Sequence, residues 1–349
     1  MILRNSDTPS MSAWLTRIWY SSAPPPLLLR PLAALFGFVA SIRRRRLQAK
    51  AVLERLPVPV IVVGNIAVGG TGKTPFVIWL VEQLRKWGWT PGVISRGYGG
   101  NSSTWPRRVD ADSNPVEVGD EPVLLAQRTG CPLAVGPDRL ISARMLLANH
   151  PVDILISDDG LQHYKLARDL EIAVVDGSRG LGNGRLLPAG SLREPPERLK
   201  EVGLVVVNGS GWKSPIGRQV ALRLVSSEVR ALKNDERRPV SSFAEQTVHA
   251  VAGIGNPARF FSMLSQHNIQ LVMHPFPDHH PFCAADLEFG DELPVLMTEK
   301  DAVKCRAFAK TGHWVVPVDG QVSAEGYALV QELTDALRVI VRTAHATEK

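Results

Sequence analysis

The sequence predicts an α/β protein in which a P-loop NTPase-like lobe with a parallel sheet is followed by a smaller α/β lobe. Apolar runs of strand length alternate with segments of helical periodicity, which is typical of a parallel sheet covered on both faces. A glycine-rich turn follows the first of these runs. A charged, irregular stretch later interrupts the alternation before it resumes, and 349 residues are enough for two hydrophobic cores.

These changes of pattern divide the chain into four parts. We expect an N-terminal basic and apolar segment at 1–57, a P-loop core at 58–225, a hinge or linker at 226–246 and a C-terminal α/β lobe at 247–349. A charged, irregular stretch that includes Pro239 marks the linker.

The N-terminal segment carries the basic character of the chain. It holds nine Lys or Arg against two acids, so it has a charge of +7, whereas the remainder has a charge of −1. An apolar run from 27 to 42 leads directly into Arg43 to Arg46. That run is too short to span a bilayer, and it predicts a membrane-associated helix that lies in the interface, with its arginines on anionic headgroups. A helix packed on the body with a solvated charge run is the alternative.

The composition excludes several classes of protein. A body with no excess of positive charge argues against nucleic-acid binding. Three scattered cysteines without a CxxC pair exclude a disulfide scaffold. Nothing in the sequence indicates an obligate protein partner.

The first element of the core is an apolar strand at 58–63, and the helix at 75–84 follows the glycine-rich turn. Strand, turn and helix in this order are the context of a phosphate-binding P-loop. Its backbone amides and the helix N-terminus attract phosphate, Lys73 reaches the outer phosphates, and the Thr74 hydroxyl holds Mg²⁺. The ATP-binding residues are therefore expected to be Ala67, Val68, Gly69, Gly70, Thr71, Gly72, Lys73 and Thr74, with Ala67 in place of the usual first glycine.

Further strands and helices are predicted from the same apolar runs and helical periodicity. Strands are predicted at 91–95, 133–135, 153–157, 171–176 and 203–208, and helices at 123–127 and 138–148. In the second lobe, strands are predicted at 248–254, 269–274 and 295–298, with a helix at 258–266.

A pair of aspartates ends the predicted strand at 153–157. An acid at the end of an apolar strand downstream of a P-loop is typical of a Walker B carboxylate, so Asp158 or Asp159 is expected to bind Mg²⁺. A surface Asp-Asp-Gly turn is the alternative.

The remaining candidates are ambiguous from local pattern alone. Capping of a helix would be enough to explain Asp120, and a structural hydrogen bond would explain His163. Asp278, His279 and His280 lack a spaced third metal ligand, so a histidine that orients a carboxylate across the cleft between the lobes is the better hypothesis. The spacing within residues 298–301 argues against a guanine-binding element.

Six motifs in order resemble one family. They are Gly-Asn-Ile-x-x-Gly-Gly-Thr-Gly-Lys-Thr-Pro (64–75), Ser-Arg-Gly-Tyr-Gly (95–99), Gly-Asp-Glu-Pro (119–122), Asp-Asp-Gly-Leu-Gln-His (158–163), Phe-Pro-Asp-His-His-Pro-Phe (276–282) and Thr-Glu-Lys-Asp-Ala-Val-Lys (298–304). The set resembles the tetraacyldisaccharide 4′-kinases, the lipid A 4′-kinases of Gram-negative bacteria, from the N-terminal helix to at least Lys304.

The resemblance implies transfer of the γ-phosphate of ATP, with Mg²⁺, to the 4′-hydroxyl of tetraacyldisaccharide 1-phosphate, which gives lipid IVA. It also implies a location at the cytoplasmic face of the inner membrane. Asp120 matches the catalytic carboxylate and His279 its partner, although His280 stays open as an alternative. Other active-site positions match Arg96, Tyr98, Arg139, Gln162 and His163, and Glu121 joins Thr74, Asp158 and Asp159 in the metal set.

A rival function is a membrane-associated P-loop regulatory or partitioning ATPase. That subclass often carries a lysine one residue before the Gly-Gly pair, where this chain has Val68.

Overall fold

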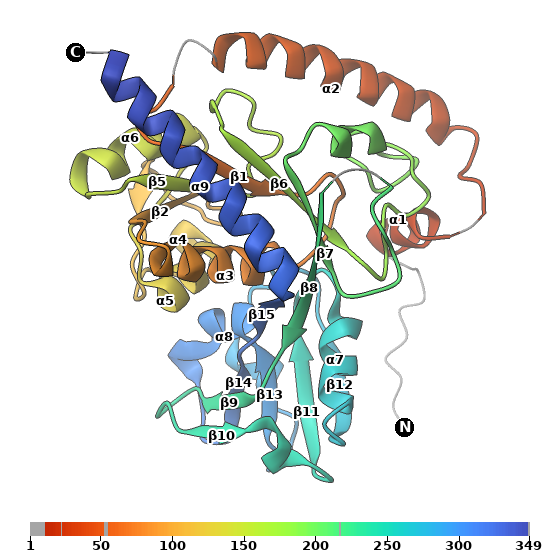
Figure 1. The fold of residues 1–349 in the computed structure, drawn as a ribbon. Helices are drawn as coiled ribbons and strands as arrows, with labels where there is room; N and C mark the ends of the chain where they lie inside the picture. The colour runs from red at the N-terminus through yellow and green to blue at the C-terminus, as the bar shows by residue number, and fades with distance from the viewer. Residues whose placement is uncertain (1–10, 22, 52–54, 216–217, 348–349) are drawn as a thin grey trace.

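The structure is a computed structural model that describes residues 11–21, 23–51, 55–215 and 218–347. Two sheets form two lobes, with the small lobe below the large one in Figure 1. In the large lobe the strand order is β15-β8-β7-β6-β1-β5-β2-β4-β3, and in the small lobe it is β10-β9-β14-β13-β11-β12. The expected α/β class is confirmed.

The strands of the large sheet are β1 (Val60–Gly64), β2 (Pro91–Ser95), β3 (Arg107–Arg108), β4 (Leu133–Val135), β5 (Ile154–Asp158), β6 (Leu170–Asp176), β7 (Leu204–Asn208), β8 (Gln219–Val225) and β15 (Asp319–Val322). The small sheet contains β9 (Glu228–Ala231), β10 (Arg237–Pro239), β11 (Thr247–Ala252), β12 (Gln270–Pro275), β13 (Val295–Thr298) and β14 (His313–Val316). The α-helices are α1 (Met11–Trp19), α2 (Leu29–Ala51), α3 (Lys73–Lys86), α4 (Pro115–Val118), α5 (Asp120–Thr129), α6 (Arg139–Asn149), α7 (Pro257–Ser265), α8 (Glu299–Cys305) and α9 (Ala324–Thr347).

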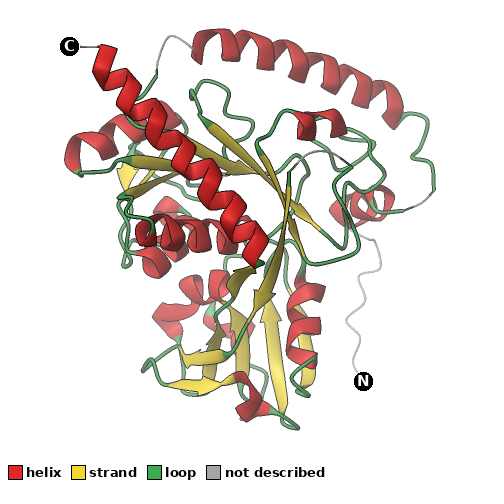
Figure 2. Cartoon of the chain, in the orientation of Figure 1, coloured by secondary structure: helices red, strands yellow, loops and turns green. Residues whose placement is uncertain are grey.

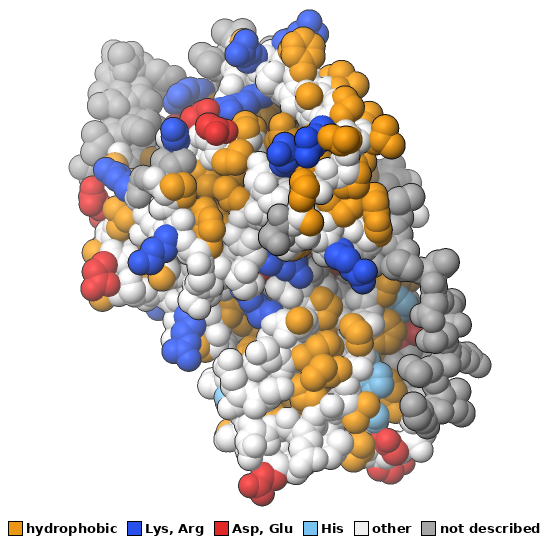
Figure 3. Space-filling view, turned by 90° about the vertical axis from the view of Figure 1, so that its right-hand side faces the viewer, with side chains coloured by type: hydrophobic (Ala, Val, Ile, Leu, Met, Phe, Trp, Pro, Cys, Tyr) orange, Lys and Arg blue, Asp and Glu red, His pale blue; other side chains and the backbone are white. Residues whose placement is uncertain are grey.

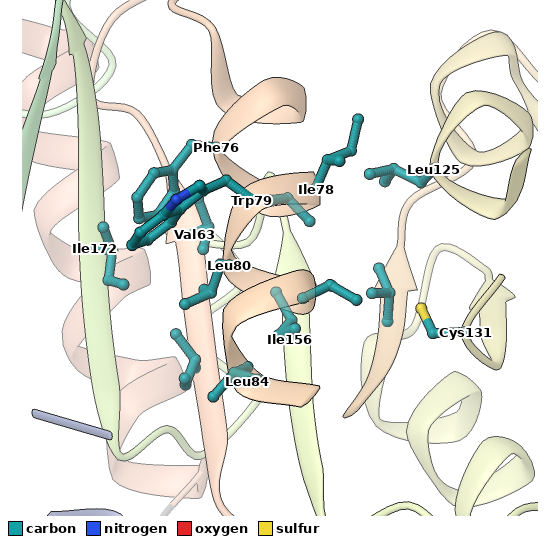
Figure 4. Close-up of a cluster of buried hydrophobic side chains, with 14 of the residues drawn as sticks. Val63, Phe76, Ile78, Trp79, Leu80, Leu84, Leu125, Cys131, Ile156 and Ile172 are labelled. Atoms are coloured by element: carbon teal, nitrogen blue, oxygen red, sulfur yellow. The ribbon is translucent and has the colours of Figure 1, made fainter. Parts of the chain in front are cut away.

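The centre of the large sheet is parallel, and β1 lies between β5 and β6. All five residues of β1 are buried, since helices cover both faces of the sheet (Figure 2). On one face the apolar side of α3 packs against β1 and β6, as Phe76, Leu80 and Ile172 show in Figure 4. This packing fixes the first turn of α3 at the carboxyl end of β1, beside the predicted P-loop.

The small lobe is inserted into the large one. The chain leaves the large sheet after β8 and returns to it as β15, which pairs with β8 through Asp319 and Val225. Helix α9 then lies across the large sheet and contributes Val330 and Leu337 to its core (Figure 1). The segment 226–246, expected as a linker, contains β9 and β10 of the small sheet.

The N-terminal segment folds into α1 and α2, and α2 lies along the outside of the large lobe (Figure 1). Its outer side exposes a continuous set of large apolar side chains, which contributes to the hydrophobic area at the top of Figure 3. The members of this set are Leu32, Leu35, Phe38 and Val39, and Leu28 directly before the helix joins them; all are more than half exposed. In the described part of the chain, no helix is long and apolar enough to cross a membrane.

Candidate active site

The predicted P-loop joins β1 to α3. Gly72 has φ of 88° and precedes the first residue of α3, so the chain turns sharply into the helix. The Asn208 side chain, at the end of β7, donates to the Thr71 carbonyl over 3.0 Å, and a Cβ on Gly72 would lie 2.1 Å from its Nδ2. The loop also meets the small lobe, because a Cβ on Gly255 would lie 2.6 Å from the Gly70 nitrogen.

The aspartate pair lies beside this loop. Asp158 is the last residue of β5, and Asp159 has a left-handed φ of 47°. Lys73 Nζ lies 3.4 Å from Asp159 Oδ1. Burial raises the pKa of Asp158, and the neighbouring Glu121 and Asp159 carboxylates raise it further. Burial also favours a higher pKa for Asp159, but Lys73 and Arg193 outweigh it and the pKa of Asp159 is lowered.

Several oxygens around the loop are suited to a divalent cation. Asp158 Oδ1 and Thr71 Oγ1 are buried without a hydrogen-bond partner, and the buried Asp159 Oδ1 faces the Lys73 ammonium at 3.4 Å. Such oxygens are the ligands that Mg²⁺ prefers, and it commonly takes its remaining ligands from phosphate and water. Within the described ranges, no group of three or more His, Cys, Asp or Glu side chains is arranged to hold a metal ion.

Asp120 and His279 come together from opposite lobes. Asp120 is the first residue of α5, after Gly119 in the N-cap position, and it is buried. His279 Nδ1 lies 3.2 Å from both oxygens of Asp120, whereas His280 contacts Asp286 in its own lobe. His279 has φ of 60°, so its backbone holds a strained conformation at the cleft.

Positive charges keep Asp120 ionised. Burial alone would raise its pKa, but the hydrogen bond to His279 and the charges of Lys300 and Lys304 lower it to about 2. Lys304 Nζ lies 3.4 Å from Asp120 Oδ2. Lys300 Nζ lies 3.0 Å from Glu121 Oε1, so Glu121 has a lysine partner from the small lobe. The local pattern did not single out these two lysines, although both lie in the last of the six motifs.

The other expected site residues line one cavity of about 1030 Å³ between α2 and the carboxyl ends of the central strands. They are Arg96, Tyr98, Arg139, Asp159, Gln162 and His163, and α2 adds Phe36, Arg43 and Leu47. The cavity therefore connects the acidic end of β5 with the N-terminal helix.

Two of these residues also support the wall of the cavity. Arg139 is buried and donates to the carbonyls of Gly136 and Asp158, and burial lowers its pKa to about 10. His163 Nε2 accepts from the backbone amide of Arg139 over 3.4 Å, and burial together with the charge of Arg139 lowers the pKa of His163 to about 4.

A hydrogen-bond network in the wall of the cavity was not expected from the sequence. The Glu194 carboxylate accepts hydrogen bonds from Gln162, Tyr164 and Arg198. The guanidinium of Arg44 on α2 lies 5.4 Å from the centre of the Tyr164 ring. Gln162 lies in the motif at 158–163, whereas no motif marks Glu194, Tyr164 or Arg198, because their significance depends on contacts between distant segments.

Comparisons with known proteins agree with this arrangement. The family model described as tetraacyldisaccharide-1-P 4′-kinase matches residues 26–338. A tetraacyldisaccharide 4′-kinase of Nitrosococcus oceani is 50% identical over 323 residues, 92% of this chain and 94% of that protein. One from Alkalilimnicola ehrlichii is 54% identical over 294 residues, 84% of this chain and 88% of that protein.

A solved structure shows the same fold. The crystal structure of LpxK from Aquifex aeolicus in complex with ATP has a TM-score of 0.72 and 28% identity, with 87% of this chain and 97% of that chain covered. The resemblance noted in the sequence is thereby confirmed, and the regulatory ATPase is not favoured. The chain belongs to the tetraacyldisaccharide-1-P 4′-kinase family.

Proposed function

We propose that this chain transfers the γ-phosphoryl group of ATP to the 4′-hydroxyl of a tetraacyldisaccharide 1-phosphate, and that it does so at a membrane surface. The observation that carries the proposal is the convergence of the six motifs on one cleft. The P-loop and the Asp158–Asp159 pair lie on one side, the Asp120–His279 pair joins the two lobes, and a large cavity leads from Asp159 to α2. An ATPase that transfers phosphate to water has no need of such a cavity.

Asp120 is the proposed general base. The acceptor is a sugar hydroxyl that is not ionised at neutral pH, so its proton must leave as the new O–P bond forms. A carboxylate with a pKa of about 2 is a weak base, so proton transfer is late and Asp120 acts mainly by holding the hydroxyl in position. His279 donates to Asp120 and fixes the orientation of its carboxylate.

Charge on the phosphates is the second requirement. Lys73 and the amides of the loop neutralise the γ-phosphoryl oxygens as charge spreads over them. Asp158 and Asp159, with Thr74 and Glu121, would hold Mg²⁺, which when bound supplies positive charge between the phosphates of ATP. The buried Asp158 Oδ1, which has no hydrogen-bond partner, supports this assignment.

The proposed route for the lipid follows from α2. Four acyl chains remain in lipid, so the enzyme must approach its substrate at the bilayer. The exposed apolar residues of α2 and the arginines at 43–46 suit an interfacial helix that lies on the cytoplasmic face of the inner membrane. The cavity opens beside this helix, so a sugar headgroup could enter it while the chains stay outside.

The test is a direct assay. Purified protein is incubated with γ-labelled ATP, Mg²⁺ and tetraacyldisaccharide 1-phosphate in mixed micelles, and the product is analysed for a second phosphate at the 4′ position. We expect label in the lipid and little ATP hydrolysis without it. Acceptor-independent hydrolysis with no labelled lipid would support the regulatory ATPase instead.

A further inference from the structure

Lys300 contacts three groups of the cleft at once. Its Nζ lies 3.0 Å from Glu121 Oε1, 3.0 Å from Asp278 Oδ1 and 3.1 Å from His279 Nε2. A lysine ammonium has three protons and no lone pair, so these three contacts use every donor that it has. Glu121 belongs to the large lobe, whereas Asp278 and His279 belong to the small lobe.

The contact with His279 fixes the ring in one form. An ammonium can donate to Nε2 only while that nitrogen carries no proton. The proton of the neutral ring must then be on Nδ1, which faces both oxygens of Asp120 at 3.2 Å. The chain of contacts from Lys300 through His279 to Asp120 is therefore consistent only with a neutral imidazole that donates to Asp120.

We propose that Lys300 is a positioning residue for the phosphoryl transfer, and that it keeps His279 neutral with its proton on Nδ1, directed at Asp120. This inference rests on the proposed function, in which Asp120 takes the proton of the acceptor hydroxyl. In that step the acceptor oxygen forms a bond to the γ-phosphorus, the bond from that phosphorus to the bridging oxygen breaks, and ADP leaves with that oxygen. The hydroxyl proton moves to an Asp120 oxygen, and His279 keeps its own proton. A doubly protonated His279 would pair with Asp120 as an ion pair and weaken it further as a base.

The surrounding charges show why a lysine is needed. Asp120 on α5 and Asp278 beside the ring raise the pKa of His279 despite its burial, and Lys300 opposes that rise. Glu121 and Lys304 are the other charged groups around the pair, and the Tyr98 ring lies 4.9 Å from the His279 ring. Without Lys300, the Asp120 and Asp278 carboxylates would face the imidazole unopposed by that charge and favour its protonated form.

Lys304 offers a matched comparison. It is a second lysine of α8 that lies 3.4 Å from Asp120 Oδ2 and 3.1 Å from Asp301 Oδ1, and no contact joins it to the His279 ring. Loss of Lys304 removes the same charge from the neighbourhood of Asp120 and leaves the Nε2 contact in place. Lys310, paired with Glu288 on the surface, is the control outside the site.

The experiment has two readouts on the full-length enzyme. Histidine ¹⁵N shifts, with His279 assigned through His279→Gln, report which ring nitrogen is protonated. Turnover against pH is measured for wild type, Lys300→Met, Lys300→Arg, Lys304→Met and Lys310→Met. In wild type at mildly alkaline pH we expect a neutral ring with its proton on Nδ1.

In Lys300→Met we expect a protonated His279 ring at neutral pH and a fall in kcat of about tenfold or more. In the curve of turnover against pH, we expect the acid limb to be displaced towards neutral pH. The KM for ATP should change little, Lys300→Arg should restore the neutral ring in part, and Lys304→Met should leave the ring state unchanged.

Two results would overturn the proposal. One is a wild-type ring that is protonated on Nε2 at mildly alkaline pH, which needs no variant and so does not depend on whether a variant folds. The other is a Lys300→Met enzyme with wild-type ring state and acid limb. Failure of the proposed function is distinct, because it would appear as full turnover in Asp120→Ala.

Discussion

Arg128 and Glu299 join the two lobes through a nearly buried ion pair. Arg128 Nη1 lies 2.6 and 2.8 Å from the two carboxylate oxygens of Glu299, and Glu299 also accepts from the Val318 amide. Arg128 lies in the last turn of the helix that begins with Asp120, and Glu299 begins the helix that carries Lys300 and Lys304. The two helices therefore run side by side in opposite directions, with ion pairs at both ends.

Loss of one partner of this pair should destabilise the enzyme strongly. Arg128→Met leaves the buried Glu299 carboxylate without its cation, and we expect a loss of about 3 kcal/mol in the free energy of unfolding, measured by urea denaturation. Arg108→Met is the control, because Arg108 pairs with Asp110 on the surface and should matter by less than about 1 kcal/mol. Equal losses in both variants would contradict a special role for the pair.

Asp120→Asn should separate chemistry from nucleotide binding. We expect turnover to fall by about 10²–10⁴-fold, since the amide cannot accept the hydroxyl proton, while ATP binds as in wild type. Steady-state kinetics and ATP titration measure the two effects. Asp112→Asn, on an exposed aspartate in the loop before α4, should leave both unchanged. Wild-type turnover in Asp120→Asn would remove Asp120 from the mechanism.

Gly72→Ala should weaken ATP binding. Its φ of 88° disfavours any side chain, and its Cβ would collide with the Asn208 amide that holds Thr71. We expect the Kd for ATP to rise by about tenfold or more, because the loop amides would move away from the phosphates. Gly312→Ala introduces similar backbone strain at φ of 91° with open space around it, so it should lower stability and leave the Kd unchanged. Identical Kd values in both variants would count against the loop as the phosphate site.

His163 should make the enzyme less stable in mild acid. The pKa of His163 in the folded protein is about 4, below its ordinary value of 6.5. Between these two pH values the histidine is protonated in the unfolded chain and neutral in the folded chain. The stability from this group is complete above pH 6.5 and is lost as the pH falls to about 4, by the order of 2 kcal/mol given its partial exposure. His163→Gln should flatten the pH dependence of unfolding in this window, and His150→Gln is the control for the loss of an imidazole. A curve for His163→Gln parallel to wild type would disprove the assignment.

Replacement of Arg43, Arg45 and Arg46 by Gln should loosen membrane binding. Each basic residue near an anionic surface contributes about 1 kcal/mol, so partitioning onto vesicles with anionic phospholipid should fall by about 100-fold. Arg44 is kept, because it pairs with Glu201 and its change would disturb the fold. The exposed arginines 218, 223 and 237 provide a control with the same change of charge. Unchanged sedimentation with vesicles would exclude this anchor.

The sequence predicted the parallel core well, because its strands are short apolar runs that are buried on both faces. The prediction for 91–95 coincides with β2, and the one for 295–298 with β13. The edge strand β15 and its neighbour β8 were not predicted, since their alternating or polar patterns are also typical of loops. Pattern alone could not assign β15 and α9 to the large sheet, because that depends on pairing with a distant strand.

The site was predictable to the extent that its residues lie in motifs. The motifs named Asp120 and His279, and the structure brings these two side chains together across the cleft. They gave no reason to single out Lys300, because its relevance arises only when α8 packs against α5. The Glu194 network was beyond prediction for the same reason, since Gln162 and Tyr164 reach Glu194 only in the folded chain.

The insertion of the small lobe has a mechanical consequence. The two connections to that lobe leave from β8 and β15, which are neighbours at one edge of the large sheet. Because the two connections are adjacent, they allow the small lobe to rotate about one hinge axis and resist its rotation about its own long axis. Nucleotide would thus enter and leave with a single hinge motion of the small lobe. The same motion would separate His279 from Asp120 and Gly255 from Gly70 at the same time.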